Sequence, residues 1–164
     1  MVASDLDAVN VKRERLSAWI EAHSTCARVV VARRGEPVNA RQVLADLGRA
    51  VKLDSMCVYL LVEAGPEVVT RYIGKTNDPA ARWKAHLAAL AAGLNGYGLW
   101  RQALLDERGL ARADLDLIVI EQGEILEPPL AGFPTTIGSI EYPLVGLAQD
   151  AHPGQLLNHE GNRR

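Results

Sequence analysis

The strongest constraint on the fold of this chain is a pair of short apolar runs, residues 57–63 and 68–73, each of which carries one tyrosine. The sequence Ala64-Gly65-Pro66-Glu67 between them is typical of a turn. Two such runs on either side of a short turn indicate an antiparallel β-hairpin. We therefore predict a hairpin over this stretch, with Gly74 ending its second strand.

A helix is predicted directly after the hairpin. Asp78 can cap its first turn, Pro79 suits the first helical position because its missing N–H would have no partner there, and Gly93 ends the helix. Arg82 and His86 are one turn apart and therefore share a face beside the apolar stripe. A core helix has no need of these two side chains, so the stretch indicates a site that handles phosphate.

Two more helices and one more strand are predicted in the rest of the C-terminal part. A helix covers about 97–108 and a strand covers 115–121. The last helix begins at Ser139, after a loop rich in proline and glycine. From Asp150 onward the sequence is polar and is expected to form a loop.

The N-terminal part, residues 1–55, is expected to be a helical extension. Its pattern predicts a helix over 4–22, a short β-branched run at 29–31, and a second helix that Asn39 can cap. The fold class expected for the whole chain is α/β (α+β), with a small, mainly antiparallel three-stranded sheet flanked by helices. That sheet is expected within a domain covering 56–164.

The composition allows a sizeable core and sets limits on function. Hydrophobic residues make up 48% of the 164 residues, and the formal net charge is −2. This charge argues against a protein that coats nucleic acid by charge alone, although it allows a local basic patch. No apolar run reaches the length of a membrane span. The start lacks a signal-type segment, so Cys26 and Cys57 are expected as thiols in a reducing cytoplasm.

Residue types that suit phosphodiester hydrolysis follow from its chemistry. The reaction needs a poised nucleophile, neutralisation of phosphate charge and help for the leaving alkoxide. Arg82 suits a phosphate oxygen because its planar fork donates two bonds and stays charged. Tyr59 could orient or deprotonate water, but an ordinary phenol is a poor base at neutral pH. A metal, a cation or an imidazole nearby would have to lower its pKa, and Lys75 and His86 are the candidates.

The order strand, strand, helix, helix, strand, helix, together with Cys57-Val58-Tyr59 and Tyr72-Ile73-Gly74, resembles the GIY-YIG nuclease family over roughly residues 56–160. In that family a Tyr-Ile-Gly on the second strand is followed by a lysine and by an arginine on the first helix. A metal-binding glutamate on a later helix and an asparagine near the end come next, and several members also carry a histidine one turn after the arginine. The matching positions here are Tyr59, Tyr72, Lys75, Arg82, His86, Glu141 and Asn158.

The resemblance implies a metal-dependent endonuclease that acts on DNA with one Mg²⁺ or Mn²⁺ ion. Glu141 would hold the metal and Asn158 would support the site. Some relatives are dimeric, so a homodimer is among the expectations, and the N-terminal part could supply a dimer interface or DNA contacts. The chain departs from the family at Cys57, which adds a side chain where the family has glycine.

Other interpretations of these residues stay open. Glu121 and Glu124 compete with Glu141 as the acid, and a glutamate in a first helical turn is favourable without any function. Asn158 lies close to Asn162, and asparagine is common in loops.

A second function is also open, namely a nucleic-acid-binding or protein-interaction module that keeps the fold without turnover. A third interpretation is a globular domain with a coincidental match to the family. Tyr59 and Tyr72 would then be core or edge-strand aromatics, Arg82 and His86 a solvated helix face, and Lys75 a turn lysine. His152 and His159 are expected in the polar tail rather than as ligands.

Overall fold

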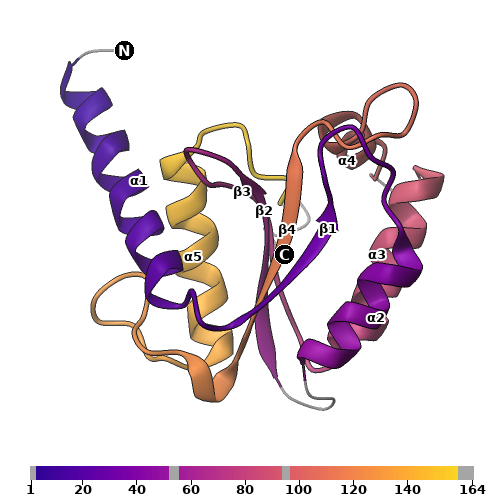
Figure 1. The fold of residues 1–164 in the computed structure, drawn as a ribbon. Helices are drawn as coiled ribbons and strands as arrows, with labels where there is room; N and C mark the ends of the chain where they lie inside the picture. Colours follow the sequence, from indigo (N-terminus) through magenta and orange to yellow (C-terminus); the bar gives the residue numbers. More distant parts are fainter. Residues whose placement is uncertain (1–2, 52–55, 94–96, 159–164) are drawn as a thin grey trace.

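The computed structural model describes residues 3–51, 56–93 and 97–158 of the chain (Figure 1). The helices are α1 (Ala3–Ala22), α2 (Ala40–Ala50), α3 (Pro79–Ala92), α4 (Tyr97–Leu104) and α5 (Ile137–Ala151), with a short 3-10 helix η1 (Gln122–Glu124). The strands are β1 (Ala27–Ala32), β2 (Cys57–Ala64), β3 (Val69–Thr76) and β4 (Asp114–Glu121). The expected α+β fold, with an antiparallel sheet flanked by helices, is confirmed.

The sheet has four strands in the order β1-β4-β2-β3, and each neighbouring pair is antiparallel. The expected number of three strands is therefore wrong. The β-branched run near residue 30 forms β1, which pairs with β4 and becomes one edge of the sheet. Side chains reinforce this pairing, because Arg28 and Arg33 both bond the buried carboxylate of Asp116, at 2.9 and 3.0 Å.

Helices cover both faces of the sheet. In Figure 1, α1 and α5 lie on one side of the strands and α2 and α3 on the other. Two separate apolar cores follow, and β2 alternates between them: Tyr59 and Leu61 face the α2–α3 side, while Val58 and Leu60 face the α1–α5 side. Because both faces are covered, β2 reads as a continuous apolar run rather than an alternating one.

Residues from the first fifty-five positions are tied to the rest of the chain at several points. Trp19 of α1 donates a hydrogen bond from Nε1 to the carbonyl of Glu127 (2.8 Å), and Arg13 donates one to the carbonyl of Ala151 (2.7 Å).

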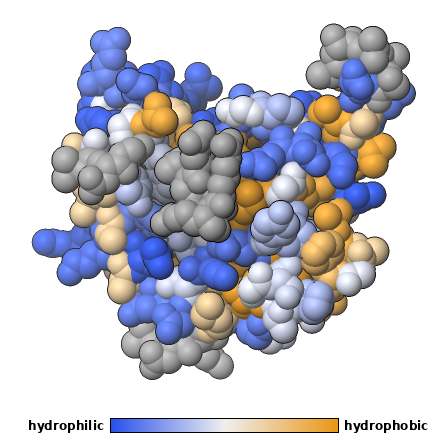
Figure 2. All heavy atoms as spheres, turned by 180° about the vertical axis from the view of Figure 1, so that it is seen from behind, coloured by the Kyte–Doolittle hydropathy of each residue, from blue (hydrophilic) through white to orange (hydrophobic). Residues whose placement is uncertain are grey.

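In the view of Figure 2, hydrophobic side chains gather on the half of the molecule where α1 and α5 lie. Part of that surface is α1 itself, since Leu6 and Val11 are each 51% exposed. A domain boundary near residue 55 stays a prediction.

Local signals place the start of α2 and both ends of α3 correctly. The side chains of Asn39 and Asp78 accept hydrogen bonds from the first turns of α2 and α3, as predicted, and Gly93 ends α3 with φ of 67°. Three predicted ends are wrong, and one of them is the start of α5, which is Ile137 rather than Ser139. The strand β3 continues through Gly74 to Thr76, and α4 ends at Leu104, after which the chain turns back.

The segment after α5 is packed against the sheet rather than forming a polar tail. The amide of Leu157 donates to the carbonyl of Arg71 (2.5 Å), so this segment lies along the open edge of β3. His152 is buried and its Nε2 lies 3.1 Å from the Glu67 carboxylate, which corrects its expected place in a solvated tail. His159 lies outside the described residues. No helix in the described part is long and apolar enough to cross a bilayer.

Candidate active site

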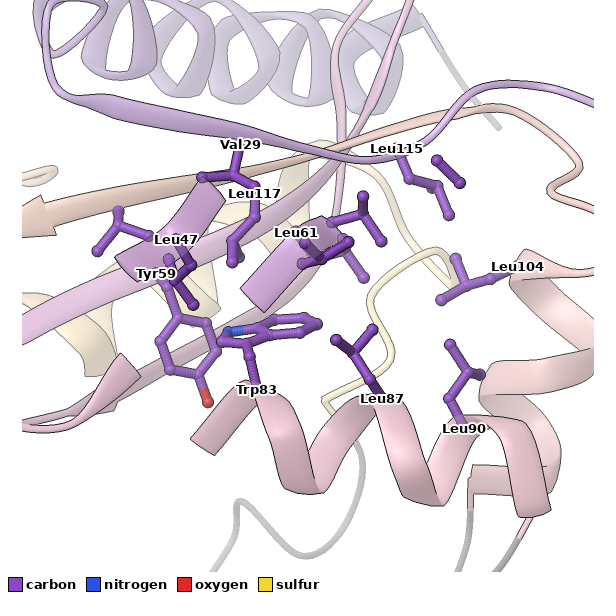
Figure 3. Packing of buried hydrophobic residues seen from close by; sticks show 14 of the residues in the cluster. Val29, Leu47, Tyr59, Leu61, Trp83, Leu87, Leu90, Leu104, Leu115 and Leu117 are labelled. Carbon is purple, nitrogen blue, oxygen red and sulfur yellow. The ribbon is translucent and has the colours of Figure 1, made fainter. Parts of the chain in front are cut away.

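Tyr59 lies on the inner strand β2, where its register partner on β3 is Gly74. A β-carbon built on Gly74 would collide with the Tyr59 hydroxyl and ring. The absent side chain therefore leaves the space that the phenol occupies. Tyr59 is 1% exposed, and Figure 3 shows its ring beside Trp83 with the hydroxyl at the margin of the apolar cluster.

His86 of α3 lies between two phenol hydroxyls. Its Nε2 is 3.1 Å from the Tyr59 hydroxyl, and its Nδ1 is hydrogen-bonded to the Tyr97 hydroxyl. Tyr97 begins α4, which the sequence predicted as a helix without giving this tyrosine a role. A tyrosine at the start of a helix is no signal by itself, so only the packing of α4 against α3 brings it to the histidine.

Six rings form what we call the aromatic cluster. Its closest ring contacts include Tyr72 with Trp100 (4.6 Å between centroids), Tyr97 with Trp100 (4.8 Å) and Trp83 with His86 (5.0 Å). Such tilted and edge contacts at these distances are the favourable geometries for aromatic pairs. The members of the aromatic cluster are Tyr59, Tyr72, Trp83, His86, Tyr97 and Trp100.

Burial decides the protonation of the aromatic cluster. It raises the pKa of Tyr59 far above the ordinary value for a phenol, with a smaller contribution from Tyr72. It also lowers the pKa of His86 to about 4, so the imidazole is neutral at neutral pH. Among the described side chains, the loss of solvation outweighs the opposing charge of Arg82. A lowering of the Tyr59 pKa by a bound metal ion stays a prediction.

Three charged side chains from β3, α3 and α5 form what we call the charged group: Lys75, Arg82 and Glu141. Lys75 is on β3, and its Nζ is 3.9 Å from a carboxylate oxygen of Glu141 on α5. Burial raises the pKa of Glu141, and the nearby charges of Lys75 and Arg82 oppose this. The sequence predicted Glu141 in the first turn of the last helix, but α5 begins at Ile137 and Glu141 lies beyond its first turn. A favourable interaction with the helix dipole therefore does not explain a glutamate at this position.

Arg82 connects the charged group with the aromatic cluster. Arg82 is the fourth residue of α3, and its side chain is exposed. Burial is the main cause of the pKa shifts of all four groups. It raises the pKa of Tyr59, Tyr97 and Glu141, where the charge of Arg82 opposes it, and it lowers the pKa of His86, where Arg82 acts in the same direction. One guanidinium therefore lies within electrostatic range of both sets of side chains, although they belong to helices on opposite faces of the sheet.

Asn158 is buried and braces β3 next to this site. Its side-chain oxygen accepts from the amide of Ile73, and its side-chain nitrogen donates to the carbonyl of the same residue, both at 2.8 Å. It thus satisfies the backbone of an edge strand one residue before Gly74. Asn158 positions the strand and contacts neither the charged group nor the aromatic cluster through a described hydrogen bond. The competing Asn162 lies outside the described residues.

Cys57 lies two residues before Tyr59 on β2 and belongs to the same core. Its side chain is fully buried in the core on the α2–α3 side, and its Sγ is 3.3 Å from the carbonyl of Thr76. Burial raises the pKa of this thiol to about 12. Cys57 is therefore an unreactive core residue, and its side chain fills space that a glycine would leave.

The described residues offer one well-placed acid for a metal. Glu121 and Glu124, the alternative acids to Glu141, form a capping box at η1, in which the Glu124 carboxylate accepts a hydrogen bond from the Glu121 amide. Their carboxylates are therefore already engaged with the backbone. No group of three or more His, Cys, Asp or Glu side chains in the described part could enclose a cation. Mg²⁺ often takes one or two carboxylates and completes its shell with waters and substrate phosphates. The half-buried Glu141 fits that pattern, although not an all-protein metal cage.

Comparisons with known proteins do not assign a family. No family model matches the chain, and neither curated proteins nor solved structures give a significant match. The resemblance to GIY-YIG nucleases therefore stays a prediction that rests on the residues and their arrangement.

Proposed function

We propose that the chain is a metal-dependent endonuclease that hydrolyses DNA phosphodiester bonds at a site with one Mg²⁺ or Mn²⁺ ion. The observation that carries this proposal is the geometry at β3: Lys75, whose Nζ is 3.9 Å from Glu141, directly follows Gly74, the register partner of Tyr59. The charge of Arg82 acts on Tyr59 and His86 as well as on Glu141, which agrees with this geometry. Phosphate binding, proton transfer and metal binding need side chains within a few ångströms of one reacting group. An arginine that reaches both sets supports one site rather than two.

Each part of the site would have its own task. Arg82 and Lys75 are exposed cations and would neutralise the phosphate oxygens. Tyr59 would position the attacking water, with His86 as the acceptor of its phenol proton. Tyr72 would pack against the Tyr59 ring, whose centroid is 6.1 Å away, and Asn158 would hold β3 in place.

Glu141 would hold the divalent cation together with substrate oxygens. When bound, this cation would polarise the phosphate and stabilise the leaving alkoxide. The raised pKa of Glu141 also fits a carboxylate that lacks enough neighbouring donors in the protein alone.

One observation favours the second candidate, a nucleic-acid-binding module without turnover. Tyr59 is 1% exposed and His86 is 5% exposed, so both are closed off in the described structure. A binding module would need only the exposed cations Lys75 and Arg82, and it would leave the aromatic cluster as a core.

The experiment is cleavage of supercoiled plasmid with Mg²⁺, with and without a chelator. We expect nicking that the chelator stops and that both Glu141→Ala and Arg82→Ala reduce at least about 100-fold. Matched controls are Glu107→Ala and Arg15→Ala, two exposed residues of the same types, which should cleave like the wild type. Binding of DNA without any cleavage would support the module, and nicking that survives chelation or both site variants would overturn the assigned site.

A further inference from the structure

The hydrogen bonds of His86 raise a question that the proposed function leaves open, namely which ring nitrogen carries the proton. The imidazole contacts one hydroxyl at each nitrogen, Tyr59 at Nε2 and Tyr97 at Nδ1. A neutral imidazole donates from one nitrogen and accepts at the other, whereas a phenol can do either. Since burial keeps the imidazole neutral near pH 7, one tyrosine must donate a hydrogen bond to the ring and the other must accept one from it.

The difference in burial between the two tyrosines decides which hydroxyl donates to the imidazole and which accepts from it. Tyr59 is 1% exposed, and within the described residues its hydroxyl has one hydrogen bond, to His86 Nε2. A buried hydroxyl that donates to nothing is costly, so the Tyr59 proton is directed at Nε2. Tyr97 is only partly buried, and its hydroxyl can donate to water while its oxygen accepts from Nδ1–H.

We propose that Tyr97 is a positioning residue for His86, which it holds as the Nδ1–H tautomer with Nε2 free to accept the proton of Tyr59. Arg82 and Glu141 are the charged groups whose fields reach Tyr59, and Arg82 is the one that reaches His86 and Tyr97. Neither is hydrogen-bonded to the imidazole in the described structure. The tautomer therefore depends on the two phenols.

This arrangement also makes a path for a proton from the buried phenol to solvent. When Tyr59 gives its proton to Nε2, Nδ1 passes its own proton to the Tyr97 oxygen, and Tyr97 releases its hydroxyl proton to water. The histidine then ends neutral, as the other tautomer, and Tyr59 ends as a phenolate. One proton leaves Tyr59 and one reaches water, so the imidazole stays neutral and the negative charge lies on the Tyr59 oxygen. This kinetic role rests on the proposed nuclease function, whereas the tautomer does not.

The direct test is long-range ¹H–¹⁵N NMR of the wild-type protein labelled at histidine, with His86→Gln to assign the signal. We expect a pyrrole-type Nδ1 and a pyridine-type Nε2 for His86 at pH 7. The reverse pattern would overturn the proposal, whether or not the protein cleaves DNA, and this measurement needs no folded variant at Tyr97.

Tyr97→Phe then tests the link between the two residues. It removes the acceptor of Nδ1–H, so we expect the Nε2–H tautomer to gain population and kcat for plasmid nicking to fall roughly 10- to 100-fold with unchanged KM. Tyr142→Phe is the matched control, since Tyr142 is 80% exposed and should change neither quantity. An unchanged tautomer in folded Tyr97→Phe, or an unchanged kcat, would contradict the proposal. If the wild type does not cleave DNA, the nuclease function fails, and the spectra alone decide the tautomer.

Discussion

The aromatic cluster and the charged group differ in almost every physical respect although Arg82 links them. The aromatic cluster is mostly buried and neutral, and burial moves its pKa values away from ionisation at neutral pH. The charged group is more open to solvent, with Lys75 45% and Glu141 28% exposed at the side chain. Proton transfer benefits from fixed hydrogen bonds in a dry environment, whereas phosphate binding needs cations that DNA can reach. In the proposed nuclease, one site would therefore divide these tasks between the two faces of an edge strand.

The largest expected effect that distinguishes the aromatic cluster from the charged group is a change in the free energy of unfolding with pH. His86 has an ordinary pKa of 6.5 that burial lowers to about 4. Between these values the unfolded chain binds a proton that the folded chain does not, so acidification from pH 6.5 to 4 should destabilise the protein. The loss is at most about 3 kcal/mol and levels off below about pH 4. Urea unfolding of the wild type and of His86→Gln at several pH values would measure it.

The difference between the two stability curves is the quantity that matters, because all other groups are shared. Curves that stay parallel across this pH range would show that His86 is not a buried neutral imidazole, and the contrast between the aromatic cluster and the charged group would lose its main support.

A change confined to the charged group should affect cleavage and leave stability alone. Arg82→Lys keeps the positive charge but loses the planar fork that bonds two phosphate oxygens. We expect plasmid nicking about 100-fold slower, with a free energy of unfolding within about 0.5 kcal/mol of the wild type. Arg15→Lys, on α1, is the matched control. A full rate in Arg82→Lys would mean that charge alone suffices at this position.

A substitution at Gly74, between Tyr72 of the aromatic cluster and Lys75 of the charged group on β3, should disturb the aromatic cluster. Gly74→Ala places a β-carbon against the Tyr59 ring and hydroxyl, and overpacking of this kind costs about 1–3 kcal/mol. Gly48→Ala is the matched control, since nothing lies within 4 Å of a β-carbon there. In the interior of α2 that change should stabilise by about 0.5–1 kcal/mol. Equal effects of the two alanines in urea unfolding would rule out the close packing of Tyr59 on Gly74.

The smallest expected effect concerns the brace on β3. Asn158→Ala removes both hydrogen bonds to the Ile73 backbone, which we expect to cost roughly 1–2 kcal/mol. Hydrogen exchange should become faster at the Ile73 amide, which loses its acceptor. A similar acceleration at distant amides of β1 would indicate global loosening instead of a local role for this side chain.

Local signals in the sequence were enough for the hairpin and for α3. Asp78, Pro79 and Gly93 bound the helix that bears Arg82 and His86, and the hairpin follows from its turn. These features act within a few residues, where capping and turn chemistry decide the structure.

Features that depend on distant contacts could not be predicted in the same way. β1 joins the sheet through β4, and its Arg28 bonds Asp116, which is 88 residues away. Tyr97 reaches His86 only because α4 packs beside α3, and Asn158 reaches Ile73 only because the last segment turns back along β3. The pKa shifts of Tyr59 and His86 likewise follow from burial, which no local pattern determines.

The central claim is that the aromatic cluster and the charged group act in one reaction. Single-turnover nicking of plasmid by Tyr59→Phe, Glu141→Gln and the double variant tests it most directly. We predict that each single change slows nicking at least about 100-fold and that the double variant is about as slow as the slower single one, because residues that act as a unit are not additive. Losses that multiply in the double variant, or a single variant that cleaves like the wild type, would contradict the claim.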